Sequence, residues 1–286
     1  MPLQTILAVL TGDDVDRSVL DAAIALTSPE PLAITALHVK ADPQTTLPLF
    51  REGLSSAMIG EVVASMEREA TARARKARAV FDTWCGEAKI TARASDSGSA
   101  LTSSAATWRE LVGQEDDEVA LVARNVDVVL LARRDDMRGT DLVAFCLFNS
   151  GRPMLLTPPS VPAKLGGHIG IFWNGGVQSA RAVGDAMPLL RRSDRITVYT
   201  TGAEGPAPSA GDLARRLSQA GMTTMVDMVS PGIKSAAVPL LEAAERDDVD
   251  LIVMGGFGHG RFRELIFGGV TKAVVQNSRA AAFLSH

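Results

Sequence analysis

The feature that most constrains the fold is an alternation of short apolar runs with longer amphipathic stretches, and the whole alternation occurs twice along the chain. Runs that stay apolar, without a polar residue at every second position, are typical of parallel strands buried on both faces. Amphipathic stretches between them indicate helices that cover such a sheet. At about 100–200 residues per domain, 286 residues suffice for two domains, so the sequence predicts two related α/β halves.

The same order of segments occurs in both halves. In the first half, the predicted strands are Thr5–Leu10, Leu32–Val39, Ile90–Ala94, Val126–Ala132 and Pro153–Thr157, and the predicted helices are Asp16–Leu26, Met58–Trp84, Asp116–Asn125 and Thr140–Phe148. In the second half, the predicted strands are Ile169–Trp173, Ile196–Thr201, Thr223–Val229, Val249–Gly255 and Ala281–Ser285, and the predicted helices are Ser179–Leu190, Gly211–Ala220, Ile233–Arg246 and Thr271–Asn277.

Two short segments also match between the halves. Val126–Ala132 parallels Val249–Gly255, an offset of 123, whereas Ser150 parallels Ser278, an offset of 128. The second half therefore holds five more residues between its fourth and fifth strands, where its glycines lie. The predicted domains are residues 1–159 and 167–286, joined by a segment rich in proline and glycine at 158–167.

Charge and composition exclude several classes of protein. The net charge is −4 and the pI is about 5.6, which gives no general attraction to nucleic acid or to an anionic membrane. We interpret the densest basic run, Arg73–Arg78, as a solvated helix face. No apolar stretch is long enough to span a membrane, and the N-terminus does not resemble a signal peptide, so we expect a cytoplasmic protein. Two isolated cysteines predict neither a disulfide framework nor a thiolate metal site.

The segment from Val253 to Thr271 carries the strongest chemical signal. It begins at the end of an apolar strand and leads into a helix, with glycines at positions 255, 256, 258, 260, 268 and 269. Glycine allows positive φ and close approach of a ligand, and backbone N–H groups at a helix start bind phosphate. Arg261 and Arg263 would add positive charge. The alternative interpretation is a glycine-rich turn that binds nothing.

The position of this segment favours binding. In an open parallel sheet, ligands bind beyond the carboxyl ends of the strands at the topological switch point. With the strand order 3-2-1-4-5, that point lies between the first strand, which ends at Trp173-Asn174, and the fourth, which ends at Gly255. The Asn174 amide has the groups to hydrogen-bond a ribose or a base edge. Its alternative role is to stabilise the turn before the next helix.

The glycine segment resembles the nucleotide motif of the universal stress protein family. That motif is Gly, two residues, Gly, nine residues, Gly, then Ser or Thr, and Gly255, Gly258 and Gly268 fit its spacing. Residues 172–182 look like the first turn of tandem bacterial members, with Asn174 where the family often has an Asp near the adenosine. The likeness extends over essentially the whole chain, because each of its two halves resembles one family domain.

The resemblance implies two Rossmann-like domains of the adenine nucleotide alpha hydrolase type, each a five-stranded parallel sheet of order 3-2-1-4-5 flanked by helices. It implies that the halves form an intramolecular pseudo-dimer through their final strands, near Met154–Thr157 and Ala282–Ser285. It also implies a stress sensor that binds ATP, with Mg²⁺, and signals through a protein partner; a further homodimer is left open. The predicted nucleotide-binding residues are Trp173, Asn174, Gly175, Val198, Gly255, Gly256, Gly258, His259, Gly260, Arg261, Gly268, Gly269, Val270 and Thr271.

Two departures from the family pattern bear on this prediction. Gly269 stands where ATP-binding members carry Ser or Thr, so a hydroxyl contact to phosphate is missing, and Thr271 is the candidate substitute. In the first half, Ala132-Arg133-Arg134-Asp135-Asp136 replaces the glycines, so we expect this half to be a degenerate partner. We therefore predict at most one nucleotide per chain.

No group of residues predicts catalysis. The sequence has no nucleophile elbow, no spacing typical of a catalytic triad and no persuasive pair of carboxylates for acid–base work. We therefore expect a binding protein and not an enzyme. Two alternatives remain open: a slow ATP hydrolase, and an interaction module that has lost nucleotide binding in both halves.

Overall fold

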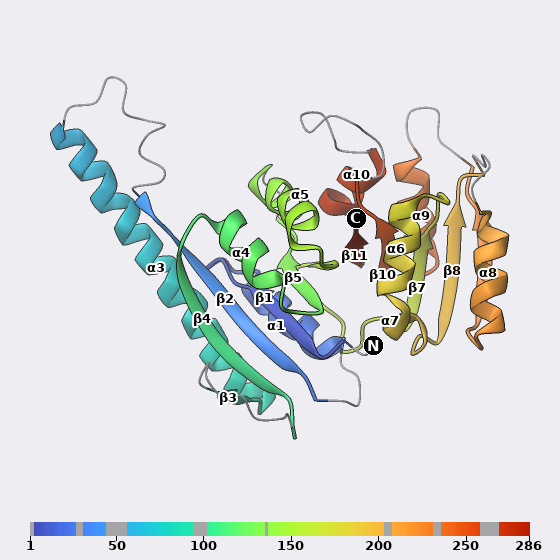
Figure 1. Ribbon diagram of the computed structural model, residues 1–286, viewed down its shortest axis with the longest axis horizontal. Coiled ribbons are helices and arrows are strands. Elements are labelled where there is room, and N and C mark those ends of the chain that lie inside the picture. The colour runs from blue at the N-terminus through green and yellow to red at the C-terminus, as the bar shows by residue number, and fades with distance from the viewer. Residues whose placement is uncertain are drawn as a thin grey trace.

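The computed structural model describes residues 3–26, 31–43, 56–93, 102–134, 137–202, 208–230, 236–257 and 269–286. Its described strands form a single sheet of eleven strands in the order β3-β4-β2-β1-β5-β6-β11-β10-β7-β8-β9. Figure 1 shows the two halves side by side, the first in blue to green and the second in yellow to red.

The first half consists of a parallel sheet and the helices that pack on its two faces. Its strands are β1 (Thr5–Val9), β2 (Ala33–Ala41), β3 (Thr91–Arg93), β4 (Ala105–Gly113), β5 (Val128–Ala132) and β6 (Met154–Thr157). Its helices are α1 (Asp16–Ala25), α3 (Ser56–Ala88), α4 (Glu115–Ala123) and α5 (Met137–Ser150).

The second half repeats this arrangement of strands and helices. Its strands are β7 (His168–Phe172), β8 (Arg195–Thr200), β9 (Thr224–Met228), β10 (Leu251–Gly255) and β11 (Ala281–Ser285). Its helices are α6 (Val177–Asp185), α7 (Met187–Leu190), α8 (Ala210–Gln219), α9 (Ala237–Arg246) and α10 (Gly269–Asn277).

The strand order confirms the predicted topology. The order 3-2-1-4-5 appears as β4-β2-β1-β5-β6 in the first half and as β9-β8-β7-β10-β11 in the second. All strand pairs within a half are parallel, whereas β6 and β11 pair antiparallel, with Leu155 opposite Phe283. The predicted pairing through the final strands is therefore confirmed, and it joins the two sheets into one.

Two predicted segments were wrong. The predicted third strand, Ile90–Ala94, is the short edge strand β3, and the strand next to β2 is β4, which we did not predict. Arg109 and Glu110 interrupt the apolar pattern of β4 because that part lies beyond β3, where both side chains are exposed. The predicted helix Ser179–Leu190 is divided into α6 and α7, and Pro188 lies in the first turn of α7.

Helices cover both faces of the sheet, and each face has one buried apolar cluster that runs through both halves. One cluster joins Ile6, Leu20 and Phe81 of the first half to Val198 and Val253 of the second. The other joins residues under α4, α5, α9 and α10 on the opposite face. The continuous apolar runs of the central strands are therefore explained by burial on both faces.

The pairing register gives a residue-by-residue correspondence between the halves. Thr5 pairs with Ala33 as His168 pairs with Arg195, and Ile6 pairs with Val128 as Ile169 pairs with Leu251. The turns after β1 and β7 correspond as well, because Gly12 (φ +82°) and Gly175 (φ +71°) both adopt positive φ. On this register, Thr200 of β8 corresponds to His38 of β2.

The basic run on α3 is paired with acidic neighbours. Arg73 contacts Glu69 at 2.6 Å, Lys76 contacts Asp14 at 2.7 Å and Arg78 contacts Asp82 at 2.9 Å, all as partly exposed ion pairs. This agrees with a solvated helix face. In the part of the chain that the structure describes, no helix combines the length and apolarity needed to cross a membrane.

Candidate functional site

A cavity of about 430 Å³ lies at the carboxyl ends of β7, β8 and β10, where the topology predicts a ligand. Its volume falls within the range of about 300–1,000 Å³ that is typical of small-molecule sites. The described residues that line it are Phe172, Trp173, Asn174, Gln178, Ser179, Thr200, Thr201, Ala236, Leu240, Met254, Gly255, Gly269, Val270 and Thr271.

The turn after β7 forms one side of the cavity. The Asn174 side chain is exposed, and its Oδ1 accepts a hydrogen bond from the Gly176 N–H at 3.0 Å. The predicted turn-stabilising role of Asn174 is thus observed, while its Nδ2 donates no hydrogen bond within the described residues. Trp173 is fixed by an Nε1–H hydrogen bond to the Pro208 carbonyl at 2.9 Å.

Two glycines at the end of β10 allow neighbouring helices to pack closely against the backbone of this strand end. A Cβ on Gly255 would lie 2.5 Å from the backbone nitrogen of Ser179, in the first turn of α6. A Cβ on Gly256 would lie 3.1 Å from Leu147 of α5, in the first half. Gly255 therefore brings α6 against the fourth strand, and Gly256 brings the two halves together. Gly255 also lines the cavity, so the ligand-binding role predicted for these two glycines stays a prediction.

The first turn of α10 forms the opposite side of the cavity. Gly269 is exposed at the start of this helix, and Val270 and Thr271 line the cavity beside it. Only 4% of the Thr271 surface is accessible. Free N–H groups at a helix start, together with the helix dipole, favour an anion at this side.

The structure brings part of the predicted set together. Six predicted residues line the cavity: Trp173, Asn174, Gly255, Gly269, Val270 and Thr271. Gly175 lies in the turn beside it, and Gly256 lies at the contact between the halves. Val198 is fully buried in the core and does not line the cavity. Gly258, His259, Gly260, Arg261 and Gly268 lie outside the described residues.

Sequence reasoning missed the contribution of β8 and of the helices around the cavity. Thr200 is the last residue of β8, which pairs directly with β7, and Thr201 follows it. The rule that ligands bind at the carboxyl ends of adjacent parallel strands would have pointed to these two residues. Gln178, Ala236 and Leu240 carried no comparable signal, because their positions depend on how α6 and α9 pack.

The described lining is mostly apolar and carries no charged side chain. It offers hydroxyl and amide groups from Ser179, Thr200, Thr201 and Asn174, and apolar surface from Phe172 and other side chains. None of the described lining residues is ionisable, so none can act as a general base or as a carboxylate ligand. Elsewhere in the described chain, no group of three His, Cys, Asp or Glu residues is arranged to hold a metal ion.

In the first half, His38 and α3 occupy part of the corresponding region. His38, which corresponds to Thr200, is 3% exposed, bonds the Leu10 carbonyl through Nδ1 at 2.8 Å and stacks near Trp108. A Cβ on Gly12 would lie 2.6 Å from the Arg73 carbonyl of α3, so this helix closes the turn after β1.

Carboxylates further disfavour a phosphate in the first half. Arg134 lies 3.9 Å from Asp13, and its charge also acts on Glu115, whose pKa is raised by desolvation. Asp16 is buried and accepts the N–H groups of Thr11 and Gly12 at 2.9 and 2.8 Å. That the first half is a degenerate partner stays a prediction, which these carboxylates favour.

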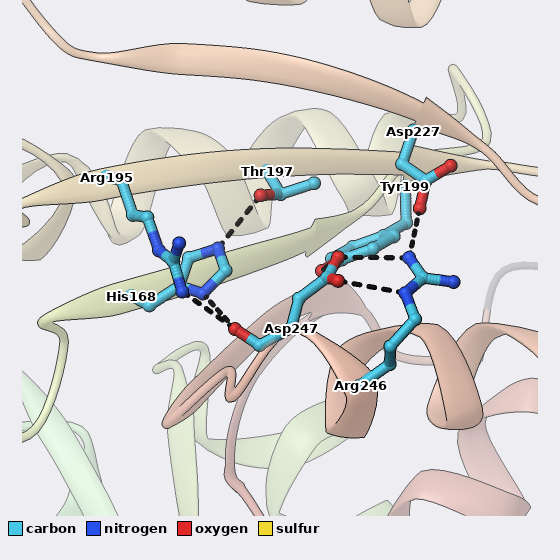
Figure 2. Close-up of polar contacts among 7 residues, drawn as sticks. All are labelled: His168, Arg195, Thr197, Tyr199, Asp227, Arg246 and Asp247. Atoms are coloured by element: carbon cyan, nitrogen blue, oxygen red, sulfur yellow. Dashed lines mark hydrogen bonds and ion pairs between the residues drawn. The ribbon is translucent and has the colours of Figure 1, made fainter.

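A second polar group, on the α9 face of the second half, is structural in character (Figure 2). The buried His168 bonds the Asp247 carbonyl through Nδ1 and the Thr197 hydroxyl through Nε2, both at 2.8 Å. Tyr199 donates to the Asp247 carboxylate at 2.7 Å, and Arg246 donates to the same carboxylate. These groups satisfy one another and tie the end of α9 to β7 and β8.

The comparisons with known proteins agree with this fold. The model of the family described as "Universal stress protein family" matches residues 232–282, from the segment before α9 into β11. This confirms the resemblance that the glycine spacing predicted. No curated protein matches the sequence.

Solved structures resemble the chain over nearly its whole length. A universal stress protein from Archaeoglobus fulgidus is 14% identical, with a TM-score of 0.63 over 98% of this chain and 95% of the other. A putative universal stress protein from Pseudomonas aeruginosa is 13% identical, with a TM-score of 0.55 over 99% and 93%. A Pseudomonas aeruginosa protein of unknown function is 11% identical, with a TM-score of 0.53 over 99% and 92%. At these identities the likeness concerns the fold.

Proposed function

We propose that this chain, which has the fold of universal stress proteins and matches their family over residues 232–282, is a regulator that binds one adenine nucleotide in its second half. The ligand is ATP, accompanied by Mg²⁺. The protein acts in the cytoplasm, in the response to stress, through a protein partner that responds to the bound nucleotide.

The cavity between the turn after β7 and the first turn of α10 carries this proposal. Apolar surface from Phe172, Leu240 and Met254 suits the faces of a base, and the hydroxyl and amide groups nearby suit a ribose. The start of α10 suits phosphate. Since no carboxylate is among the described lining residues, Mg²⁺ would be held by phosphate oxygens and water. The lack of an ionisable group in this lining favours binding over hydrolysis.

The proposal is tested by nucleotide binding to the full chain. Isothermal titration with Mg·ATP should give one site per chain, and Thr201→Trp, which adds bulk beside the cavity, should weaken binding at least about tenfold through steric exclusion. Val39→Trp is the matched control because Val39 holds the corresponding position in the first half, and it should bind ATP as the parent does. No binding by the parent, or two equivalent sites, would overturn the proposal. The interaction-module alternative would then take its place.

A further inference from the structure

The described residues just before and just after the glycine segment, residues 258–268, pack against the first half of the chain. Before the segment, Phe257 is 4% exposed, and its ring lies 5.5 Å from that of Phe148 on α5. Phe148 also contacts His286, whose Nδ1 lies 3.1 Å from the Gly256 carbonyl. After the segment, α10 packs against α5.

Arg133 makes the most specific of these contacts. Its Nε–H donates to the Val275 carbonyl at 3.0 Å, one terminal nitrogen donates to the Ser278 carbonyl, and the other donates to the Ala280 carbonyl at 3.1 Å. These carbonyls belong to the last turn of α10 and to the residues that follow it. A guanidinium at this end of a helix satisfies free carbonyl groups and opposes the negative pole of the helix dipole.

Arg133 is itself held in place. It follows β5 directly, its N–H donates to the Thr157 carbonyl at 2.9 Å, and the residue is 8% exposed. In the second half, Gly256 holds the corresponding place and donates to the Ser285 carbonyl at 2.7 Å. Because Gly256 has no side chain, it cannot cap α5 as Arg133 caps α10. The contact runs in one direction, from the first half to the helix beside the cavity.

We propose that Arg133 is a positioning residue for the nucleotide site: the first half holds α10 by its C-terminus so that the N-terminus of the helix meets the phosphates. The inference rests on the proposed function, since it assigns the regulation of that same site. A ligand at one end of α10 and Arg133 at the other then act on one rigid element. Binding and the contact between the halves are coupled, and the coupling is reciprocal.

The test compares Arg133→Met with the parent in the full chain, using ATP and adenosine as separate probes. Arg133→Met should weaken ATP about fivefold to tenfold, within the usual range of coupling between sites, and leave adenosine within about twofold. Arg133→Lys should recover part of the ATP affinity. In the parent, ATP should slow hydrogen exchange at the end of α10, and this protection should be reduced in Arg133→Met.

Arg152→Met is the matched control. The Arg152 guanidinium donates to the Arg124 carbonyl at 2.9 Å, just past the end of α4, so it caps a helix within the first half. This variant should lose stability without changing the ratio of ATP to adenosine affinity. Equal weakening of both ligands by Arg133→Met, or unchanged ATP affinity, overturns the inference and leaves the proposed function standing. A parent that binds no ATP overturns both.

Discussion

Asp127 and Asp250 hold the same position in the two halves, directly before β5 and β10, and each carboxylate accepts N–H groups from the start of the neighbouring first strand, β1 or β7. Asp127 accepts from Gln4 and Thr5, both at 2.8 Å, and Asp250 accepts from Gly166, Gly167 and His168 at 2.7 to 3.1 Å. The same side chain thus fixes the pairing of the two central strands in each half.

Asp127→Asn should reduce the free energy of unfolding by about 1–2 kcal/mol at pH 7, because charged acceptors make the stronger hydrogen bonds. Burial alone would raise the pKa of Asp127, but the N–H groups of Thr5 and Gln4 hold it below its usual value. This stabilisation is present above the unfolded pKa of about 4 and is lost as the pH falls below it. Urea unfolding at pH 7 and pH 3 should therefore show a difference between parent and variant that shrinks in acid.

The control for this measurement is Asp194→Asn, which removes an exposed partner of Lys164. It should change stability by less than about 0.5 kcal/mol at either pH. A difference between parent and Asp127→Asn that stays constant from pH 7 to pH 3 would contradict an ionic contribution from Asp127.

His168 should make the second half sensitive to mild acid. A carbonyl can only accept, so His168 Nδ1 carries the proton that bonds Asp247, and Nε2 accepts from Thr197. Desolvation lowers the pKa of His168, as does the charge of Arg195. A lowered folded-state pKa means that stability is lost as the pH falls through the unfolded value of about 6.5.

Thermal unfolding at pH 7.5 and pH 5.5 checks this expectation. His168→Gln should be less stable than the parent at pH 7.5, and its melting temperature should fall less on acidification. Thr197→Val is the matched control, because it removes the hydroxyl partner but keeps the titrating ring. If the parent and His168→Gln lose the same stability in acid, His168 does not titrate in this range.

Gly255→Ala and Gly256→Ala should have different effects, although the two glycines are adjacent. The added methyl of Gly255→Ala meets the backbone of α6, which cannot move without shifting the helix, and should cost about 1–3 kcal/mol. The methyl of Gly256→Ala lies close to the end of the Leu147 side chain, at 3.1 Å, and in ordinary contact with the Ser285 carbonyl, at 3.7 Å, and should cost less than about 1 kcal/mol. Chemical unfolding of both variants provides the comparison, and equal costs would contradict it.

Gly269→Ser should tighten ATP binding, because it adds a hydroxyl at the first residue of α10, where the family carries Ser or Thr. One hydrogen bond to a charged group sets an upper limit of about 1.5–3 kcal/mol. Adenosine affinity should not change, since the new contact is to phosphate. Gly211→Ser, at the start of α8, is the control and should leave both affinities unchanged in titration calorimetry. An equal gain for adenosine would place the new contact elsewhere.

A further prediction concerns Gly258, in the glycine segment between β10 and α10. Gly258→Val should reduce nucleotide binding while the core strands stay folded, if Gly258 lets backbone N–H groups approach the phosphates. Gly258 lies outside the described residues, so the motif spacing alone supports this expectation. Titration with ATP, accompanied by circular dichroism to check folding, would test it.

The sequence predicted most of the architecture because the central strands are apolar on both faces and repeat at fixed offsets. It missed β4, whose Arg109 and Glu110 lie where the strand is exposed at the sheet edge. Lateral edges are partly solvated, so their strands lose the continuous apolar pattern that identifies the buried ones.

The candidate site was predictable where it depends on turns and not where it depends on tertiary packing. Trp173, Asn174 and Gly255 could be placed because glycine and asparagine mark the ends of strands. The role of Arg133 could not, because its carbonyl partners are more than 140 residues away and meet it only through the junction of β6 with β11. From the sequence, Arg133 is only part of a degenerate loop, whereas the structure shows its guanidinium at the end of a helix of the other half.

The antiparallel junction of β6 with β11 decides which parts of the two halves meet. The described strands of the first half run opposite to those of the second, so the carboxyl edges of the two sheets face in opposite directions. The carboxyl edge of the first half, at Arg133 and Arg134, lies beside the connection from α10 to β11, as the shared cavity lined by Asp13 and Asn277 shows. The carboxyl edge of the first half therefore adjoins the framework of the second domain, at the end of α10. The direction of the strands at this junction lets side chains of one half brace the helix that borders the candidate site of the other.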